Sequence, residues 1–140
     1  MNEEDKLSAM EIITIFYLAD EVGNKLSKEQ IMLIHYSIRN QREREINNNH
    51  INNYKRINLF SLCDYDQIFD KLLSVDIITR KFSSLHKPRY AITAKGKKIF
   101  NSIYSSFLGK ILGKIQTLFK EDISEDNLRK VVLPQVRIIK

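Results

Sequence analysis

The spacing of apolar residues changes from a helical period to a strand period and back within one short stretch, and this change constrains the fold most. Between positions 64 and 75, apolar residues recur three and four residues apart, as in an amphipathic helix. Segments 77–82 and 89–93 are instead β-branched or alternate polar with apolar side chains. From position 97 the helical spacing returns and continues to 120. This order predicts a helix, a β-hairpin and one long amphipathic helix.

Capping patterns, in which Ser or Asp precedes Glu or Gln by three positions, predict three helix starts: Ser8-x-x-Glu11, Ser27-x-x-Gln30 and Asp64-x-x-Gln67. The first helix is expected over 9–21, and its apolar residues cover nearly the whole circumference, so it should be buried on more than one side. Gly23 and Asn24 tolerate the left-handed conformation that ends a helix. A short helix is expected near 125–132.

The length of 140 residues fits one domain, and four glycines with two prolines are too few for a sandwich or barrel rich in tight turns. We therefore expect a mainly α class with a small β-hairpin. Residues 1–120 would form the domain and 121–140 a C-terminal extension. Seven asparagines fall within the nineteen residues 40–58, and asparagine favours turns, so 40–63 is interpreted as an Asn-rich insertion or loop.

Charge is unevenly distributed along the chain. The net charge is +6, yet residues 80–98 alone contain seven Lys and Arg and no acid. Residues 64–76 contain four Asp against one Lys. An excess of positive charge concentrated in this way favours an anionic partner, and nucleic acid is the first candidate.

The residues Asp-Tyr-Asp-Gln-Ile-Phe-Asp-Lys-Leu-Leu-Ser-Val-Asp-Ile-Ile-Thr-Arg-Lys-Phe (64–82) are followed by Arg-Tyr-Ala-Ile-Thr-Ala-Lys-Gly-Lys-Lys-Ile-Phe (89–100). Three helices, a hairpin and a Thr-x-Lys-Gly entry into a last helix resemble the winged helix-turn-helix superfamily, and within it bacterial regulators of the MarR and PadR groups. The resemblance spans about 8–120. It implies a winged helix with a long C-terminal helix and DNA as the partner.

The chain departs from the winged-helix pattern in two places. Helices of a helix-turn-helix are usually joined by three or four residues, whereas roughly two dozen separate Arg39 from Asp64. The helix at 64–75 also presents Asp66 and Asp70, although recognition helices normally offer donors to base edges.

The resemblance implies that the hairpin, as the wing, meets the DNA backbone or minor groove. The candidate DNA-binding residues there are Arg80, Lys81, His86, Lys87 and Arg89. Gln67 and Lys71 are the plausible base readers of the preceding helix, and Lys55 and Arg56 could extend the contact. Charged side chains of a hairpin can instead protect an edge strand, so this remains the alternative to DNA contact for the wing. Alternating Arg and Glu at 42–45 suit a solvated helix, which remains the alternative to DNA contact for the segment before the insertion.

No sequence motif indicates a catalytic, metal or cofactor site. Cys63 is the single cysteine, and His35, His50 and His86 have no carboxylate or cysteine at ligand spacing. No glycine-rich phosphate loop or nucleophile motif occurs. We expect no enzyme activity, metal or cofactor. The acidic start and the short apolar run at 12–19 suggest neither a signal peptide nor a membrane span, so we expect a cytoplasmic protein.

The resulting hypothesis is a DNA-binding winged-helix protein that acts on double-stranded DNA as a transcriptional regulator or a plasmid or phage replication or partition factor. The long apolar helix at 97–120 predicts a homodimer. The alternative is a protein–protein interaction module without DNA binding, which docks a partner through the helix at 64–75 or through 40–63. A weaker hypothesis is a regulator with a ligand pocket among the aromatic residues Phe16, Tyr17, Phe100, Tyr104 and Phe107.

Overall fold

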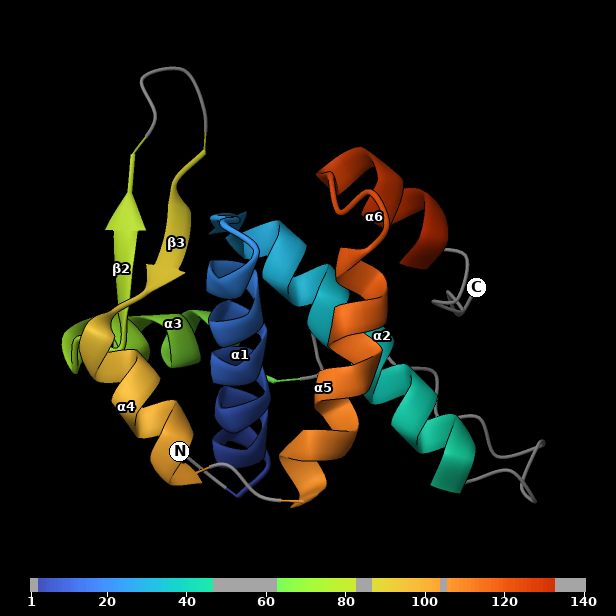
Figure 1. The fold of residues 1–140 in the computed structure, drawn as a ribbon, viewed down its shortest axis with the longest axis horizontal. Helices are drawn as coiled ribbons and strands as arrows, with labels where there is room; N and C mark the ends of the chain where they lie inside the picture. Colours follow the sequence, from blue (N-terminus) through green and yellow to red (C-terminus); the bar gives the residue numbers. More distant parts are fainter. Residues whose placement is uncertain (1–2, 47–62, 83–86, 104–105, 133–140) are drawn as a thin grey trace.

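The computed structural model describes residues 3–46, 63–82, 87–103 and 106–132 (Figure 1). Its elements are α1 (Glu3–Glu21), β1 (Leu26–Ser27), α2 (Lys28–Ile46), α3 (Tyr65–Ser74), β2 (Ile78–Lys81), β3 (Arg89–Ile92), α4 (Ala94–Ile103), α5 (Ser106–Phe119) and α6 (Glu125–Val132). The predicted class, mainly α with a small β-hairpin, is confirmed. The expected Asn-rich insertion lies largely outside the described residues, although α2 extends through Ile46.

The predicted hairpin is β2 and β3, and it belongs to an antiparallel sheet of three strands in the order β1-β3-β2. Arg80 lies opposite Tyr90 and Lys81 opposite Arg89, while Leu26 of β1 pairs with Tyr90 from the other side. The sequence does not reveal β1, because a strand of two residues is too short to establish an alternating period.

The first helix, α1, is the centre of the molecule. It contacts α2, β3, α4 and α5, and Figure 1 shows it standing between α4 and α5. Ile12, Ile15 and Thr14 have no exposed surface. The prediction of a helix buried on more than one side is therefore confirmed, since three helices and a strand cover α1 within a single chain.

The predicted start of that helix is wrong, because α1 begins at Glu3 rather than at residue 9. Ser8 and Glu11 are fully buried inside the helix and cap nothing. Arg39 of α2 donates from Nη2 to Ser8 Oγ at 2.8 Å and to Glu11 Oε1 at 2.9 Å. Two residues three positions apart share one helix face, so the same spacing that suits a cap also directs both side chains at one partner.

The other two predicted caps and the predicted end of the first helix are confirmed. Ser27 and Gln30 exchange hydrogen bonds between side chain and backbone at 2.8 and 3.2 Å, which caps α2. Asp64 accepts from the backbone N–H of Gln67 at 3.0 Å and caps α3. Gly23, at φ +76°, ends α1 with hydrogen bonds from Gly23 N–H to Asp20 and from Asn24 N–H to Ala19.

The predicted long helix at 97–120 is wrong, because α4 ends at Ile103 and α5 begins at Ser106. The two helices run in different directions on two sides of α1 (Figure 1), and both contact it. Phe100 of α4, and Ile111 and Ile115 of α5, are buried in the shared core. These three members of the apolar stripe that led us to expect a dimer are thus covered within the chain. The expected short helix near 125–132 is confirmed as α6.

Candidate nucleic-acid interface

Two exposed cations stand at the outer end of strand β2. The burial along the strand changes from buried Ile78 to exposed Arg80 and Lys81, and Phe82 directly after them is 73% exposed. Among the described residues, neither Arg80 nor Lys81 forms an ion pair with a carboxylate. The Arg80 guanidinium instead lies 5.8 Å from the ring centre of Phe82 and 5.7 Å from that of Tyr90, within range of cation–π attraction.

Lys87 and Arg89, on the other side of the hairpin, form polar contacts with other parts of the same chain. Lys87 Nζ lies 3.3 Å from Glu29 Oε2 and 3.4 Å from Glu125 Oε2, and hydrogen bonding to Glu29 raises the pKa of Lys87. Arg89 donates from Nη1 to the Lys25 carbonyl at 3.1 Å and to the Gln30 side chain at 3.0 Å. These two predicted DNA contacts therefore also brace β3 against the beginning of α2.

Lys97 is a third engaged cation of the basic stretch. Its Nζ lies 2.6 Å from Asp20 Oδ2 of α1, and this hydrogen bond raises the pKa of Lys97. Lys95 and Lys98, on the same first turn of α4, are exposed. Of the basic cluster seen in the sequence, the structure thus leaves four exposed cations without a carboxylate partner among the described residues: Arg80, Lys81, Lys95 and Lys98.

The two predicted base readers, Gln67 and Lys71, lie exposed on α3 together with Asp66 and Asp70. The charge of Asp66 is countered, because Lys28 at the start of α2 forms an ion pair with it. The remaining predicted residues, His86, Lys55 and Arg56, lie outside the described residues.

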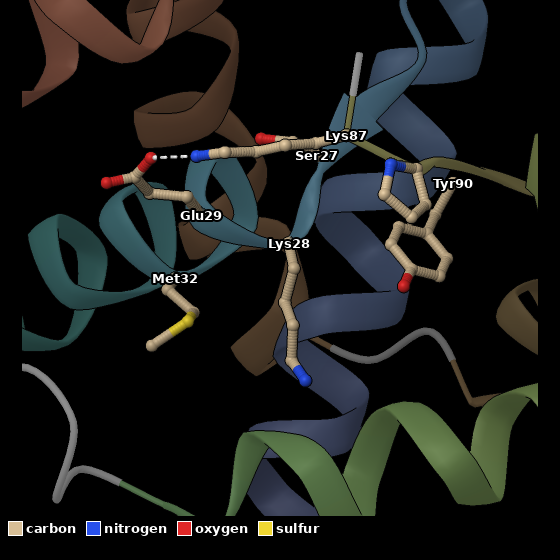
Figure 2. Close-up of a pocket in the computed structure, with 7 residues that line it drawn as sticks. Ser27, Lys28, Glu29, Met32, Lys87 and Tyr90 are labelled. Atoms are coloured by element: carbon tan, nitrogen blue, oxygen red, sulfur yellow. Dashed lines mark hydrogen bonds and ion pairs between the residues drawn. The ribbon is translucent and has the colours of Figure 1, made fainter. Parts of the chain in front are cut away.

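A hollow of about 450 Å³ opens where β3 meets the first turn of α2. Met32, Pro88 and Tyr90 form its apolar walls, and Lys28 and Lys87 stand on its rim. In Figure 2, Lys87 reaches across to Glu29 while Lys28 extends toward α3. Because both lysines on its rim already have carboxylate partners, the hollow offers an anion less than the end of β2 does.

The helix α6 is attached to this same region. Arg129 donates from Nε at 2.9 Å and from Nη2 at 2.5 Å to the two carboxylate oxygens of Glu29. Ser27 Oγ donates to Glu125 Oε1 at 2.5 Å, and Gln30 Nε2 donates to the carbonyl of Ile123 at 2.7 Å. Nothing in the sequence signals these contacts, since Glu29 and Arg129 are a hundred positions apart. Residues 121–132 are therefore packed against the domain.

A buried polar network, which the sequence analysis missed, joins α1, α2 and α3. His35 Nδ1 lies 2.7 Å from the Tyr65 hydroxyl and its Nε2 lies 3.2 Å from Glu11 Oε1, the carboxylate oxygen that also binds Arg39. All four side chains are buried. A signal was present, because polar residues 35 and 39 interrupt the apolar side of a helix at one-turn spacing.

The thiol of Cys63 borders this network and has a structural rather than a nucleophilic environment. Burial raises the pKa of Cys63 to about 11, against weaker opposing hydrogen bonds with Ser8 and Tyr65. Burial likewise raises the pKa of the Tyr65 hydroxyl. Both groups are protonated at neutral pH, and a protonated thiol is a poor nucleophile. Within the described ranges, no three His, Cys, Asp or Glu side chains are grouped as a metal site would require.

Two described members of the expected aromatic ligand pocket contact each other directly. Tyr17 of α1 and Phe100 of α4 stack with ring centres 4.1 Å apart, so their rings fill the space between the helices. Tyr104 and the side chain of Phe107 lie outside the described part.

No helix in the described part of the chain is both long and apolar enough to cross a membrane. Comparisons with protein-family models, with curated proteins and with solved structures each found no match to this chain.

Proposed function

We propose that this chain is a DNA-binding protein of the winged helix-turn-helix type, which acts in the cytoplasm as a transcriptional regulator or a plasmid or phage replication or partition factor. The observation that carries the proposal is the pair Arg80 and Lys81, exposed at the outer end of β2 without a carboxylate partner among the described residues. Lys and Arg supply most non-specific affinity for DNA by neutralising phosphates. The element order, three helices with a hairpin after the third, supports the same assignment.

The proposal gives the hairpin a larger role than α3. Helix α2 ends at Ile46 and α3 begins at Tyr65, so no turn of three or four residues joins them. The exposed side of α3 carries Asp70 beside Gln67 and Lys71, which weakens its attraction for phosphates. We therefore expect Arg80 and Lys81 to supply the main phosphate contacts.

The test is a salt titration of binding to duplex DNA. Removing one cation that neutralises a phosphate reduces the slope of log affinity against log salt by about 1, so Arg80→Ala/Lys81→Ala should reduce it by about 2. Lys95→Ala/Lys98→Ala is the matched control, because it removes two exposed cations of the same basic stretch where α4 begins, at the end of the hairpin away from Arg80. An unchanged slope in the first variant, or no binding at low salt, contradicts the proposal.

The second candidate is a protein-interaction module, favoured by the exposed acids Asp66 and Asp70 on α3. It predicts that the salt titration finds no duplex binding at all. The homodimer stays a prediction to be checked by the mass of the particle in solution. Three of the apolar residues of α4 and α5 that suggested a dimer, Phe100, Ile111 and Ile115, are buried within one chain.

A further inference from the structure

We propose that Phe82, with Arg80 and Lys81, is a stacking site for an unpaired nucleobase, so that the protein prefers DNA containing an unpaired base over continuous duplex. This inference rests on the proposed function and names the form of nucleic acid that the outer end of β2 accepts. It rests on three points: one aromatic ring is exposed, two cations lie beside it, and an aromatic ring with adjacent cations can bind a base and its phosphate.

The exposure of Phe82 sets it apart from the other aromatic residues of described burial. Its exposed fraction is 73%, whereas Phe16, Phe69, Phe100 and Tyr90 are all buried. Among residues of described burial, Phe82 and Val22 are the exposed large apolar side chains. Aromatic side chains bury a large apolar area and dominate the energetics of interfaces, so a ring left in water beside two cations is available to a partner.

Phe82 is also linked, through Arg80, to a series of aromatic rings that starts in the core. Phe16 and Phe69 meet edge to face at 6.0 Å, and Phe69 meets Tyr90 in the same way at 5.1 Å. Arg80, directly opposite Tyr90 in the sheet, contacts the rings of both Tyr90 and Phe82. The series thus begins in the core and ends in solvent, and Arg80 connects its last two rings.

The combination of an aromatic face with adjacent cations matches single-stranded nucleic acid. Proteins that bind single strands stack bases on aromatic side chains while basic residues follow the phosphates. A protein partner would also cover Phe82, but Arg80 and Lys81, which pair with no carboxylate in the described part of the chain, favour an anion. Bases in a continuous duplex have both faces covered by neighbours, so stacking on Phe82 requires a step to be opened at an energetic cost. A base that is already unpaired avoids that cost.

The experiment compares one duplex with the same duplex carrying one extra unpaired adenine, replaced by a fluorescent adenine analogue. We expect wild-type protein to bind the second about 5-fold more tightly, the lower end of what stacking of one base supplies. Phe82→Ala should bring the two affinities within about twofold. Stacking should quench the analogue in wild type and not in this variant.

Three further variants test whether the aromatic ring itself produces the preference. Phe82→Tyr keeps the aromatic face and should keep the preference, whereas Phe82→Leu keeps apolar volume without a ring and should lose it. Val22→Ala, at the other exposed large apolar side chain of described burial, should leave the affinities for both DNAs unchanged. Because Phe82 is exposed, thermal unfolding of its variants should match wild type, and Phe82→Tyr keeps the test valid if Phe82→Ala does not fold.

Equal wild-type affinity for the two DNAs overturns the stacking site and leaves the proposed function intact. Retained preference in Phe82→Leu also overturns it, because an aliphatic side chain would then suffice. Failure to bind either DNA at low salt overturns the proposed function itself.

Discussion

At the residue scale, one hydroxyl group connects the hairpin to two helices. Thr93 Oγ1 accepts from the backbone N–H of Gly96 at 2.9 Å and so caps α4. The same hydroxyl lies 2.6 Å from the Asp76 carbonyl and 3.0 Å from the Ile77 carbonyl, to which it can donate, at the end of α3. The Thr-x-Lys-Gly sequence therefore has a physical role, since its threonine fixes where β3 ends relative to α3 and α4.

The glycine of that sequence is required because of close packing. A Cβ atom added at Gly96 would lie 2.3 Å from the Ile77 carbonyl oxygen and 2.6 Å from Ile92 Cγ1. We expect Gly96→Ala to destabilise the fold by about 1–3 kcal/mol, as overpacking does. Differential scanning calorimetry should show a lower Tm.

The control for Gly96 is Gly113 of α5, where an added Cβ would meet nothing within 4 Å. Gly113→Ala should stabilise the protein by up to about 1 kcal/mol through helix propensity alone. A Tm that rises in both variants would show that the contact at Gly96 is tolerated and would contradict the prediction.

At the scale of elements, what the sequence predicts depends on how local the determining contacts are. The caps at Ser27 and Asp64 bond residues three positions away, so their sequence pattern is sufficient. The division between α4 and α5 is not visible, because the helical spacing of apolar residues continues past Ile103 in two helices that both face α1. The capping pattern at Ser8 failed because Arg39, 31 positions away, binds it instead.

The same distinction applies to the candidate site. The hairpin and its basic residues could be predicted from composition and period, since both are local. Which cations have partners could not be predicted, because Lys87 and Lys97 meet carboxylates 38 or more positions away. The sequence marks Phe82 only as a strand residue. Its exposure follows from how far β2 extends beyond the core.

The end of α3 offers a stability test at this scale. Asp76 adopts φ +63°, and its N–H bonds the Leu73 carbonyl while the N–H of Ile77 bonds that of Leu72. This left-handed position favours glycine. Asp76→Gly should raise the stability by up to about 1 kcal/mol, measured by urea unfolding, and Asp76→Val should lower it. Equal stability in both variants would mean that the conformation carries no strain.

At the scale of the whole molecule, the Glu29 carboxylate is one of the groups that attach α6 to the domain. Glu29 binds Arg129 through both oxygens and also contacts Lys87. Hydrogen bonding to Arg129 is the largest cause that lowers the pKa of Glu29 below its ordinary value of 4.5. A carboxyl group whose pKa is lowered in the folded state contributes stability above its unfolded pKa and loses that contribution as the pH falls through the folded pKa.

We therefore expect Glu29→Gln to be less stable than wild type at pH 7, because the glutamine cannot carry the charge that binds Arg129. The difference should shrink once the pH falls below 4.5, as wild-type Glu29 also becomes neutral. Urea unfolding across this pH range measures it. Glu3→Gln is a suitable control, since Glu3 lies at the exposed start of α1. A difference that is constant with pH would show that the charge of Glu29 is not what holds α6.

The attachment of α6 has a consequence for the order in which the chain acquires its structure. The first turn of α2 is formed by residues 28–31, yet the side chain that binds Glu29 through both oxygens is synthesised a hundred residues later. Contacts of such large sequence separation slow folding, since a long loop must close before they form. During synthesis α1, α2 and the hairpin can pack together first. Glu29 and Gln30 can form their contacts with residues 123–129 only after those residues have left the ribosome.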